Sequence, residues 1–485
     1  MSSEREVVEA CPTELFIGGK WVAADGGKTL AVEDPATGAT LCDVADASPA
    51  DGKAALDAAV AAQAEWAATP PRERGEILRR TYELMTERAD DLTLLMTLEM
   101  GKPVAESKGE IAYAAEFFRW FAEEAVRIEG GYQIAPNGSG RFLLMRQPVG
   151  PCLLITPWNF PAAMGARKIG PAVAAGCTMV IKPAAQTPLS MLKLAELMTE
   201  AGLPAGVLNV VTTNDAGGVM EPLIRDGRAR KLSFTGSTSV GRKLIEQAAD
   251  QVLRTSMELG GNAPLLVFED ADLDKAVDGA MLAKMRNGGE ACTSANRIYV
   301  HSAVMEEFSS RLTERMAALK VGRGTEAGVD VGPLIDGKQR DKVADLVADA
   351  IAQGARPLTG GSVAEGNGYF FQPTVLADVP VTARLQKEEI FGPVAPLTAF
   401  ETEDEAVRMA NDTEFGLVSY LFTKDLSRAL RVSERLEAGM IGLNQGIVSN
   451  PAAPFGGVKQ SGLGREGGTV GIDEYLELKY VAVSL

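Results

Sequence analysis

The sequence predicts an α/β fold with doubly wound parallel sheets. Short apolar or β-branched runs alternate with helical segments from about residue 150 onward, and a second alternating set begins near residue 264. Strands separated by helices of this length form parallel sheets that are covered on both faces. The 485 residues exceed what one hydrophobic core holds, so roughly two or three domains are expected.

The first alternating set predicts one parallel sheet. A helix between two of its strands is expected over 188–202, where Leu192, Ala195 and Met198 keep helical spacing. Gly202 is expected to end this helix, because glycine readily takes the left-handed conformation after a last turn. The strands themselves are expected at 152–156, 178–181, 207–211 and 231–235.

The second set predicts another α/β domain. We expect a strand at 264–268, a helix over about 273–286, a loop that contains Cys292, a strand at 297–300 and then a further helix. Residues 50–127, which precede both sets, are expected to be mostly helical.

An alternating apolar run at 472–485 ends the chain. An uncovered apolar strand edge recruits a partner. We therefore expect this run to form a sheet between subunits together with residues 141–150, in a homodimer or a homotetramer.

Composition and charge exclude several classes of function. Hydrophobic residues at 46% and charged residues at 23% are typical of a soluble globular protein. The net charge of −17 repels a nucleic-acid backbone, and no cluster of Lys and Arg offsets it locally. The start MSSEREVVEA lacks the features of a signal peptide, and no apolar run reaches the roughly 20 residues of a membrane span. We expect a cytoplasmic protein without nucleic-acid or membrane partners.

Cysteine and histidine usage limits the chemistry further. The five cysteines are dispersed without CxxC spacing, which predicts reduced thiols and no metal site. The only histidine, His301, follows a strand-like run and is expected at the surface near a helix start. A Ser-His-Asp triad, a papain-like Cys-His pair and a multi-histidine metal site are therefore not expected.

Five short stretches are candidates for a functional site. Three of them follow the carboxyl ends of predicted parallel strands, where doubly wound folds bind ligands. FTGST, at the start of a predicted helix, directs backbone N–H groups at a phosphate, although its glycines do not form GxGxxG. The five stretches are 155-ITPWNFP-161, 180-VIKPA-184, 234-FTGST-238, 257-MELGGN-262 and 287-NGGEACTSANR-297.

Four of these stretches, namely PWNFP, FTGST, MELGGN and the loop around Cys292, resemble signature motifs of the aldehyde dehydrogenase superfamily together with 388-EEIFGPV-394 and 454-PFGGVKQSGLGREGG-468, in its order and over nearly the full chain. The pattern is most similar to the succinate-semialdehyde dehydrogenases. The resemblance implies a cofactor-binding domain, a catalytic domain and a small β oligomerisation arm. The expected boundaries are 1–127 with 147–258 for dinucleotide binding, 259–455 for catalysis, and 128–146 with 456–485 for the arm.

The resemblance also implies a covalent mechanism. Cys292 resembles the nucleophile, which forms a thiohemiacetal and then a thioester. Glu258 resembles the general base for the thiol or the hydrolytic water, a role that needs no histidine. Asn159 and the backbone N–H of Cys292 resemble the oxyanion site. Taken singly, these residues are equally compatible with a buried thiol, a strand-end carboxylate and a turn asparagine, and only the combined pattern favours catalysis.

Cofactor contacts follow from the same similarity. Family members that prefer NAD often have a glutamate directly after KPA, which repels a 2′-phosphate. This chain has Ala185 there, which leaves space beside Lys182, so NADP is the expected cofactor and NAD the alternative. The residues expected to bind it are Thr156, Trp158, Lys182, Ala185, Ser237, Glu389 and Phe391.

Three positions indicate the substrate class. Succinate-semialdehyde dehydrogenases resemble this chain at Arg286, Arg167 and Ser449. Two guanidinium groups and a hydroxyl form a clamp for the carboxylate of a small anionic aldehyde. An isolated arginine would more often belong to a surface ion pair, and the paired match favours the clamp.

The loop around Cys292 departs from its relatives at two positions. Ser294 replaces the second cysteine that some succinate-semialdehyde dehydrogenases have, so no local disulfide switch is expected. Glu290 replaces the usual glutamine, and its carboxylate would raise the pKa of the thiol if it pointed toward Cys292. The sequence leaves the direction of this side chain open.

We therefore expect NAD(P)-dependent oxidation of succinate semialdehyde to succinate. One alternative is the same chemistry on glutarate semialdehyde or another ω-oxo acid, because a clamp fixes the carboxylate and not the chain length. A CoA-acylating enzyme and a thiol hydrolase without cofactor are further enzymatic alternatives. From a different class, the chain could be a non-catalytic binding or structural protein on the same fold.

Overall fold

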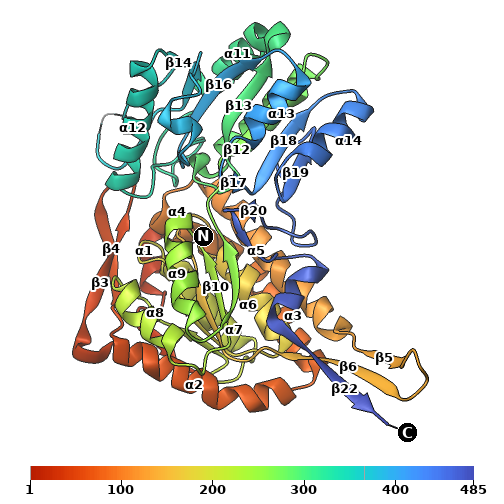
Figure 1. Cartoon of the computed structure of the whole chain (residues 1–485). Coiled ribbons are helices and arrows are strands. Elements are labelled where there is room, and N and C mark those ends of the chain that lie inside the picture. Colours follow the sequence, from red (N-terminus) through yellow and green to blue (C-terminus); the bar gives the residue numbers. More distant parts are fainter. Residues whose placement is uncertain (1, 365, 485) are drawn as a thin grey trace.

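The structure, a computed structural model, describes residues 2–364 and 366–484. Two large, mostly parallel sheets lie one above the other in Figure 1, and a narrow β arm extends from the lower half. The expected α/β class is confirmed. Among the described residues, no helix has both the length and the apolar character that a membrane span needs.

The lower sheet has eight strands in the order β2-β1-β9-β8-β7-β10-β11-β21. Its five central strands run parallel, and β2, β1 and β21 pair antiparallel at the two ends. All four strands predicted from the first alternating set are among them. The bounds are β1 (Leu15–Ile17), β2 (Lys20–Val22), β7 (Cys152–Ile155), β8 (Met179–Lys182), β9 (Leu208–Val210), β10 (Lys231–Thr235), β11 (Arg254–Glu258) and β21 (Gly462–Leu463).

Both faces of this sheet are covered, as the apolar strand sequences predict. On β7, Cys152 and Leu154 belong to one core cluster, and Leu153 and Ile155 belong to the cluster on the opposite face. The expected helical character of residues 50–127 is confirmed by α2 to α5. The helices of this half are α1 (Glu4–Glu9), α2 (Pro49–Ala68), α3 (Pro71–Glu87), α4 (Ala89–Met100), α5 (Val104–Glu124), α6 (Ala163–Ala175), α7 (Leu189–Glu200), α8 (Ala216–Arg225) and α9 (Thr238–Ala249).

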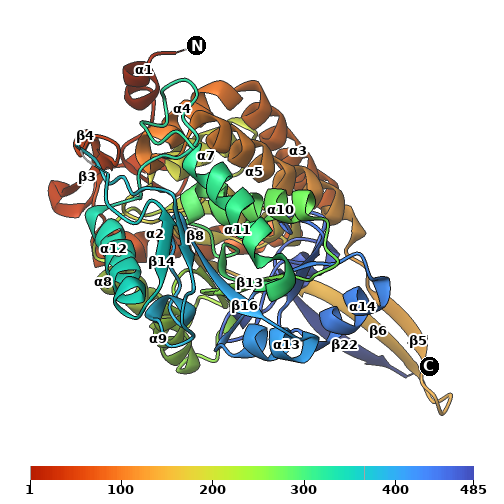
Figure 2. The same cartoon turned by 90° about the horizontal axis from the view of Figure 1, so that it is seen from above.

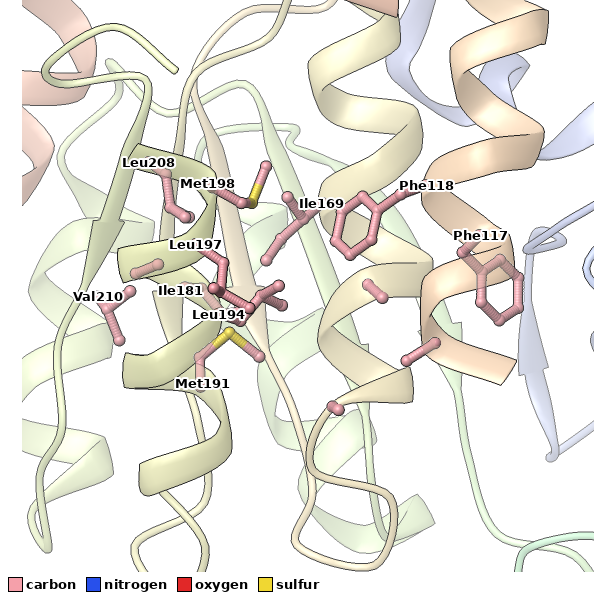
Figure 3. Packing of buried hydrophobic residues seen from close by; sticks show 14 of the residues in the cluster. Phe117, Phe118, Ile169, Ile181, Met191, Leu194, Leu197, Met198, Leu208 and Val210 are labelled. Carbon is pink, nitrogen blue, oxygen red and sulfur yellow. The ribbon is translucent and has the colours of Figure 1, made fainter. Parts of the chain in front are cut away.

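Figure 3 shows the core on the α7 face. Met191 and Leu194 of α7 lie beside Ile181 of β8, Met198 of α7 lies beside Ile169 of α6, and Phe118 of α5 lies beyond Ile169. All of these side chains are buried. The helix ends as expected, with Gly202 in the left-handed region at φ +96°.

The upper sheet has seven strands in the order β14-β15-β16-β13-β12-β18-β19, and only β14 is antiparallel. The expected strands at 264–268 and 297–300 are both present. The strands are β12 (Ala263–Val267), β13 (Ala295–His301), β14 (Arg356–Thr359), β15 (Thr374–Ala377), β16 (Val394–Phe400), β18 (Val418–Phe422) and β19 (Met440–Leu443). The helices are α10 (Leu273–Met285), α11 (Ser302–Ala317), α12 (Gly337–Ala352), α13 (Glu403–Asn411) and α14 (Leu426–Arg435).

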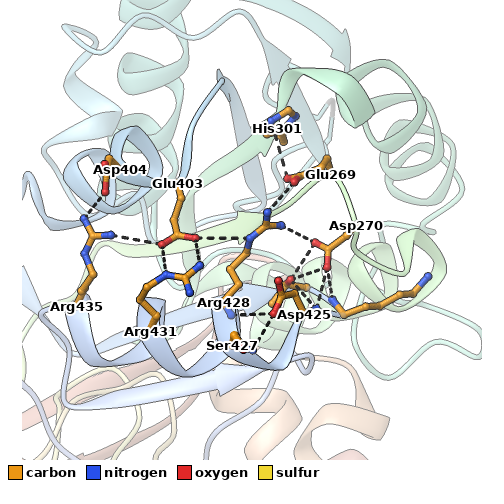
Figure 4. A network of polar contacts seen from close by, with 12 residues as sticks. Glu269, Asp270, His301, Glu403, Asp404, Asp425, Ser427, Arg428, Arg431 and Arg435 are labelled. Carbon is orange, nitrogen blue, oxygen red and sulfur yellow. Dashed lines mark hydrogen bonds and ion pairs between the residues drawn. The ribbon is translucent and has the colours of Figure 1, made fainter.

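Hydrogen bonds and ion pairs link helices α13 and α14 to the end of β12 in this sheet (Figure 4). Arg428 of α14 donates to Glu269 at 2.7 Å and to Asp270 at 2.8 Å, just after β12, and it also lies beside Glu403 of α13. His301 is at the N-cap of α11, where its Nδ1 accepts from the backbone N–H of Ala303, so it is at a helix start as expected.

The third sheet is the β arm, which projects from the body in both views (Figures 1 and 2). It consists of β5 (Gly131–Ile134), β6 (Arg141–Pro148) and β22 (Leu476–Val483), in the order β22-β6-β5. The expected pairing of the C-terminal run with residues 141–150 is present, with Leu476 opposite Pro148 and Val483 opposite Arg141.

Residues between β21 and β22 lie against the lower half and not in the arm. The 3-10 helix η5 (Thr469–Tyr475) packs against α6, and β21 pairs with β11. The expected domain boundaries stay predictions. The remaining short elements are the hairpin β3 (Thr29–Asp34) and β4 (Ala39–Ala45), the pair β17 (Phe415–Gly416) and β20 (Val458–Lys459), and the 3-10 helices η1 (Asp25–Gly27), η2 (Ala125–Arg127), η3 (Arg286–Gly289) and η4 (Arg384–Gln386).

Candidate active site

Two adjoining cavities lie at the carboxyl ends of the parallel strands of the lower sheet. The larger cavity, of about 650 Å³, is lined by Thr156, Trp158, Lys182, Ala185 and Ser237. The smaller one, of about 210 Å³, lies between the two sheets and shares Trp158 and Ser237 with the larger one. The smaller cavity is also lined by the expected catalytic residues Cys292, Glu258 and Asn159 and by Glu389 and Phe391.

The larger cavity contains polar groups that the protein itself leaves without partners. The hydroxyls of Thr156 and Thr235 are buried and make no hydrogen bond within the described chain. Burial lowers the pKa of Lys182 to about 8, and no described carboxylate forms an ion pair with its ammonium group. These groups fit a ligand that brings its own hydroxyls and negative charge.

The turn into α9 suits a phosphate group. Ser237 is the N-cap of α9, but its side chain caps none of the first N–H groups of the helix. A Cβ at Gly236 would lie 2.5 Å from the ring of Phe234, so only glycine fits this turn. Free N–H groups at a helix start bind anions. The residues of the larger cavity therefore fit a dinucleotide whose reactive end reaches the smaller cavity.

Cys292 lies in a loop whose shape depends on left-handed residues. Asn287, Gly288 and Gly289 follow α10 with φ of 57°, 61° and 82°. Tyr420 of β18 donates its hydroxyl hydrogen to the carbonyl of Thr293 at 2.9 Å and so anchors the loop. A Cβ at Gly261 would lie 2.4 Å from the carbonyl oxygen of Cys292, which explains the glycine in MELGGN.

The thiol of Cys292 is held in its protonated form by burial. Burial raises its pKa to about 12; Arg167 and Arg286 lower it, whereas Glu389 and Glu258 raise it. At neutral pH the thiol is therefore protonated in this conformation, and a nearby group must accept its proton before it can attack.

Glu258 has the properties of such a base. It ends β11, and both of its carboxyl oxygens are buried without a hydrogen-bond partner in the described chain. Burial and, next, the carboxylate of Glu466 raise its pKa well above the usual value. A raised pKa makes the carboxylate a stronger proton acceptor near neutral pH.

Asn159 is held by several contacts in the loop after β7. Its side-chain Nδ2 donates to the carbonyl of Glu290 at 2.9 Å, and its own carbonyl accepts from Asn287 Nδ2 at 2.9 Å. An amide NH₂ group has two hydrogens. The second hydrogen is free to donate to an oxyanion in the smaller cavity, which Asn159 lines.

Two of the three expected substrate residues contact each other. Arg286 Nη1 donates to Ser449 Oγ at 3.1 Å. The guanidinium of Arg286 also stacks on the ring of Phe160, 4.9 Å from its centroid, and lies 5.7 Å from the ring centroid of Tyr113. The stacking leaves other N–H groups of this fork available to a carboxylate.

Arg167 has a different environment. It is only 1% exposed, its Nε donates to Glu466 at 2.5 Å, and its guanidinium stacks on Phe455 at 4.1 Å. Its Nη2 is buried without a partner in the described chain. Glu466 therefore compensates part of the charge that the sequence assigned to the substrate clamp.

The sequence model of the Aldehyde dehydrogenase family matches residues 21–481. The chain belongs to this family. It is 59% identical to a succinate-semialdehyde dehydrogenase of Paenarthrobacter nicotinovorans, over 92% of this chain and 99% of that protein. It is 53% identical to a glutarate-semialdehyde dehydrogenase of Pseudomonas putida, over 97% and 98% of the two chains. The crystal structure of an NADP-dependent enzyme of E. coli superposes with a TM-score of 0.97 at 52% identity, over 98% of both chains.

One ionic cluster in this aldehyde dehydrogenase was missed by the sequence reasoning. Lys168 donates to Glu466 at 2.5 Å and to Ser233 at 2.9 Å. Both charged residues are buried, and Glu466 lies beside Glu258. The available signal was a charged residue in the apolar helix after PWNFP and another within GLGREGG.

The direction of Glu290 is resolved by its contact with the segment before α12. Its Oε1 accepts from the backbone N–H of Ile335 at 3.1 Å, and the side chain is 1% exposed. Burial raises the pKa of this carboxyl well above the usual value. The carboxyl therefore bonds to the backbone near α12 and not to the thiol of Cys292.

We expect Glu290→Gln to leave the pH dependence of Cys292 alkylation unchanged, because the side chain points elsewhere and glutamine can still accept from Ile335. The measurement is the iodoacetamide rate as a function of pH. A shifted profile would show that the carboxylate does sense the thiol.

The free energy of unfolding offers a second readout for the same variant. Above the unfolded-state pKa of about 4.3, Glu290 is still protonated in the folded protein but has lost its proton in the unfolded chain. The free energy of unfolding of the wild-type protein should therefore fall as the pH rises through this range. The variant should lose this contribution.

Proposed function

We propose that this aldehyde dehydrogenase oxidises succinate semialdehyde to succinate with NADP or NAD. The observation that supports the chemistry is the smaller cavity, in which Cys292, Glu258 and Asn159 line one space that adjoins the larger cavity. This arrangement argues against a non-catalytic protein, because unpartnered buried polar groups cost folding free energy without a ligand or a reaction.

Cys292, Glu258 and Asn159 would each carry out a different step of this reaction. Glu258 takes the proton of the Cys292 thiol, and the thiolate attacks the aldehyde carbon to give a thiohemiacetal. Asn159 Nδ2 and the backbone N–H of Cys292 donate to the oxyanion. A nicotinamide dinucleotide bound in the larger cavity would supply the acceptor for the hydride that leaves the substrate carbon. Once Glu258 has passed the first proton to solvent, it removes a proton from the water that hydrolyses the thioester on Cys292.

We propose NADP as the preferred cofactor. Lys182 and the other groups of the larger cavity would hold the adenosine end, while Glu389 and Phe391 would flank the nicotinamide end. Ala185 lines the cavity without a charge that would repel a 2′-phosphate. The E. coli enzyme with the similar structure is described as NADP-dependent. A clearly higher kcat/KM with NAD than with NADP would overturn this preference.

The substrate assignment rests on the pair of Arg286 and Ser449. We expect Arg286→Ala to raise KM for succinate semialdehyde about 10- to 100-fold, since a charge-assisted hydrogen bond contributes about 1.5–3 kcal/mol. KM for an uncharged aldehyde such as propionaldehyde should change little. Steady-state kinetics with saturating NADP measure both values.

A matched control for this test is Arg311→Ala. Arg311 lies on the outer helix α11 and pairs with Asp274 and Glu307. Its removal should leave both KM values unchanged. Equal effects of Arg286→Ala on the charged and the uncharged aldehyde would rule out the clamp.

Glutarate semialdehyde is the second candidate substrate, because a relative at 53% identity is a glutarate-semialdehyde dehydrogenase. Succinate semialdehyde, glutarate semialdehyde and propionaldehyde, each assayed with NAD and NADP, discriminate among the candidates. The highest kcat/KM with the five-carbon substrate would move the assignment to it. No reduction of either cofactor with any aldehyde would favour a non-catalytic protein.

The assembly we propose is a homodimer or homotetramer in the cytoplasm, joined through the β arm. Several large apolar side chains of the arm are exposed, and an uncovered apolar sheet edge recruits a partner. Light scattering after gel filtration tests this assembly. The exposed residues include Tyr132, Ile134, Leu478 and Tyr480, at 63%, 60%, 65% and 55%.

A further inference from the structure

A buried ion pair lies directly beneath the loop that presents Asn159. Lys102, in the connection between α4 and α5, and Glu110 of α5 are 3% and 2% exposed. Lys102 Nζ lies 2.6 Å from Glu110 Oε2. Both side chains are almost completely buried and line neither cavity described above, so they are not exposed to substrate or cofactor.

Lys102 fixes the backbone on which Asn159 is mounted. Its Nζ donates to the carbonyl oxygen of Asn159 at 2.8 Å. The same ammonium lies over the ring of Phe160, 4.3 Å from its centroid. Asn287 Nδ2 donates to the same carbonyl oxygen from the Cys292 loop. The Asn159 peptide is thus held between the ion pair on one side and the nucleophile loop on the other.

Glu110 fixes the next part of the chain. Its Oε1 accepts from the backbone N–H groups of Ala162 and Ala163, at 3.0 and 3.1 Å, where α6 begins. Its other oxygen, Oε2, binds Lys102. The pair therefore holds the loop after β7 at two points that bracket Phe160, and both points are within four residues of Asn159.

Stability alone does not account for this pair. Removing two charges from water costs several kcal/mol per ion, and a buried pair is on average no better than apolar side chains of the same volume. Geometry offers a better reason, because a displacement of about 1 Å at a reacting centre can cost about 10²-fold in rate. The side chain of Asn159 is aimed by the peptide that Lys102 holds.

We infer that Lys102, oriented by Glu110, is a positioning residue for the oxyanion site of Asn159. Lys102 acts through the carbonyl of Asn159 and touches neither aldehyde nor cofactor. This inference rests on the proposed function, in which the amide of Asn159 donates to the oxyanion.

The test is a double-mutant cycle on the full-length enzyme with saturating NADP. Lys102→Met alone would leave the carboxylate of Glu110 buried without its cation, which endangers folding. The variant to use is therefore Lys102→Met with Glu110→Gln, in which glutamine can still accept from Ala162 and Ala163. It is made with Asn159 present and in an Asn159→Ala background.

With Asn159 present, the Lys102/Glu110 variant should lower kcat about 10- to 100-fold, while KM for succinate semialdehyde and for NADP changes by less than about threefold. In the Asn159→Ala background, the same change should lower kcat by less than about threefold, because no amide is left to position. A role limited to general stability would reduce activity by the same factor in both backgrounds.

Lys231→Met is the matched control, because Lys231 is an equally buried lysine that donates to Ser256 on β11 and lines neither cavity. It should leave kcat unchanged. Equal factors in both backgrounds, or a wild-type kcat for the Lys102/Glu110 variant when Asn159→Ala is slow, would overturn the positioning role alone. A wild-type kcat for Asn159→Ala would overturn the oxyanion assignment and the positioning role with it.

Discussion

Replacement of Cys292 by alanine is expected to lower kcat for aldehyde oxidation by about 10⁴-fold or more, because no other described nucleophile of this loop can form the thioester. The cavity for the dinucleotide does not depend on the thiol, so the Kd for NADPH should stay within about twofold of the wild-type value. Single-turnover absorbance at the nicotinamide band measures the first quantity, and fluorescence titration with NADPH measures the second.

Cys42→Ala serves as the control for this variant. Cys42 is a half-buried free thiol on the β4 strand of the N-terminal hairpin, and it lines neither cavity. Its loss should change neither quantity. Substantial aldehyde oxidation by Cys292→Ala would remove the covalent mechanism, whereas a large loss of cofactor affinity would show that the variant disturbs the fold.

The thiol also predicts a pH dependence. Burial raises the pKa of Cys292 to about 12, so the thiolate fraction rises about tenfold for each pH unit below that value. Alkylation of the enzyme without bound ligands should therefore accelerate continuously between pH 7 and pH 10. This behaviour distinguishes a thiol that requires a base from one that is already ionised.

The parallel strands were predictable because each of them is buried on both faces. Residues 152–156 were expected to form a strand, and β7 ends one residue earlier at Ile155. Leu153 and Leu154 enter opposite core clusters, so the whole run must be apolar and stands out in the sequence. The turn residue Gly202 was predictable for a similar reason, since its φ of +96° favours glycine.

The antiparallel strands at the edge of the lower sheet were not predictable in this way. β1 and β2 have three residues each, and Lys20 in β2 is exposed. Strands of that length show no period of two. They pair with each other as a hairpin around Gly18 and Gly19, but the hairpin joins the sheet only through the pairing of Phe16 with Val210 of β9, almost two hundred positions later in the chain. A contact between residues so far apart in the chain cannot be predicted from the local sequence around either one.

In the candidate site too, local motifs were predictable from the sequence and tertiary contacts were not. Family motifs identified Cys292, Glu258 and Asn159, and the structure brings them to one cavity. The partners that set their charge state were not identified, because Lys168 and Glu466 stand far apart in the sequence and meet only through the packing of α6 against the C-terminal segment. Arg167 was assigned to substrate by the resemblance to succinate-semialdehyde dehydrogenases, yet the tertiary structure gives it Glu466 as a partner.

Glu258→Gln is the second prediction with a large effect. General-base catalysis contributes about 10²- to 10⁴-fold, so kcat should fall within that range while KM for NADP stays nearly constant. Glutamine matches the shape of glutamate, and both carboxyl oxygens of Glu258 are without partners in the described chain, so the fold should tolerate the change. Glu246→Gln, at an exposed position of α9, is the control and should have wild-type kinetics.

The pH profile and the transient phase identify which proton Glu258 moves. Burial and the neighbouring Glu466 raise the pKa of Glu258, so the wild-type base is protonated and idle at low pH, and kcat/KM should rise as the pH passes that raised pKa. The Glu258→Gln variant should lack this rise.

The transient phase shows which proton Glu258 moves. If Glu258 serves the hydrolytic water, the variant should release about one NADPH per Cys292 in a rapid burst and then turn over slowly, because the thioester accumulates. If it serves the thiol, no burst appears and high pH restores the rate. Unchanged kcat together with a wild-type pH profile would show that a different group is the base.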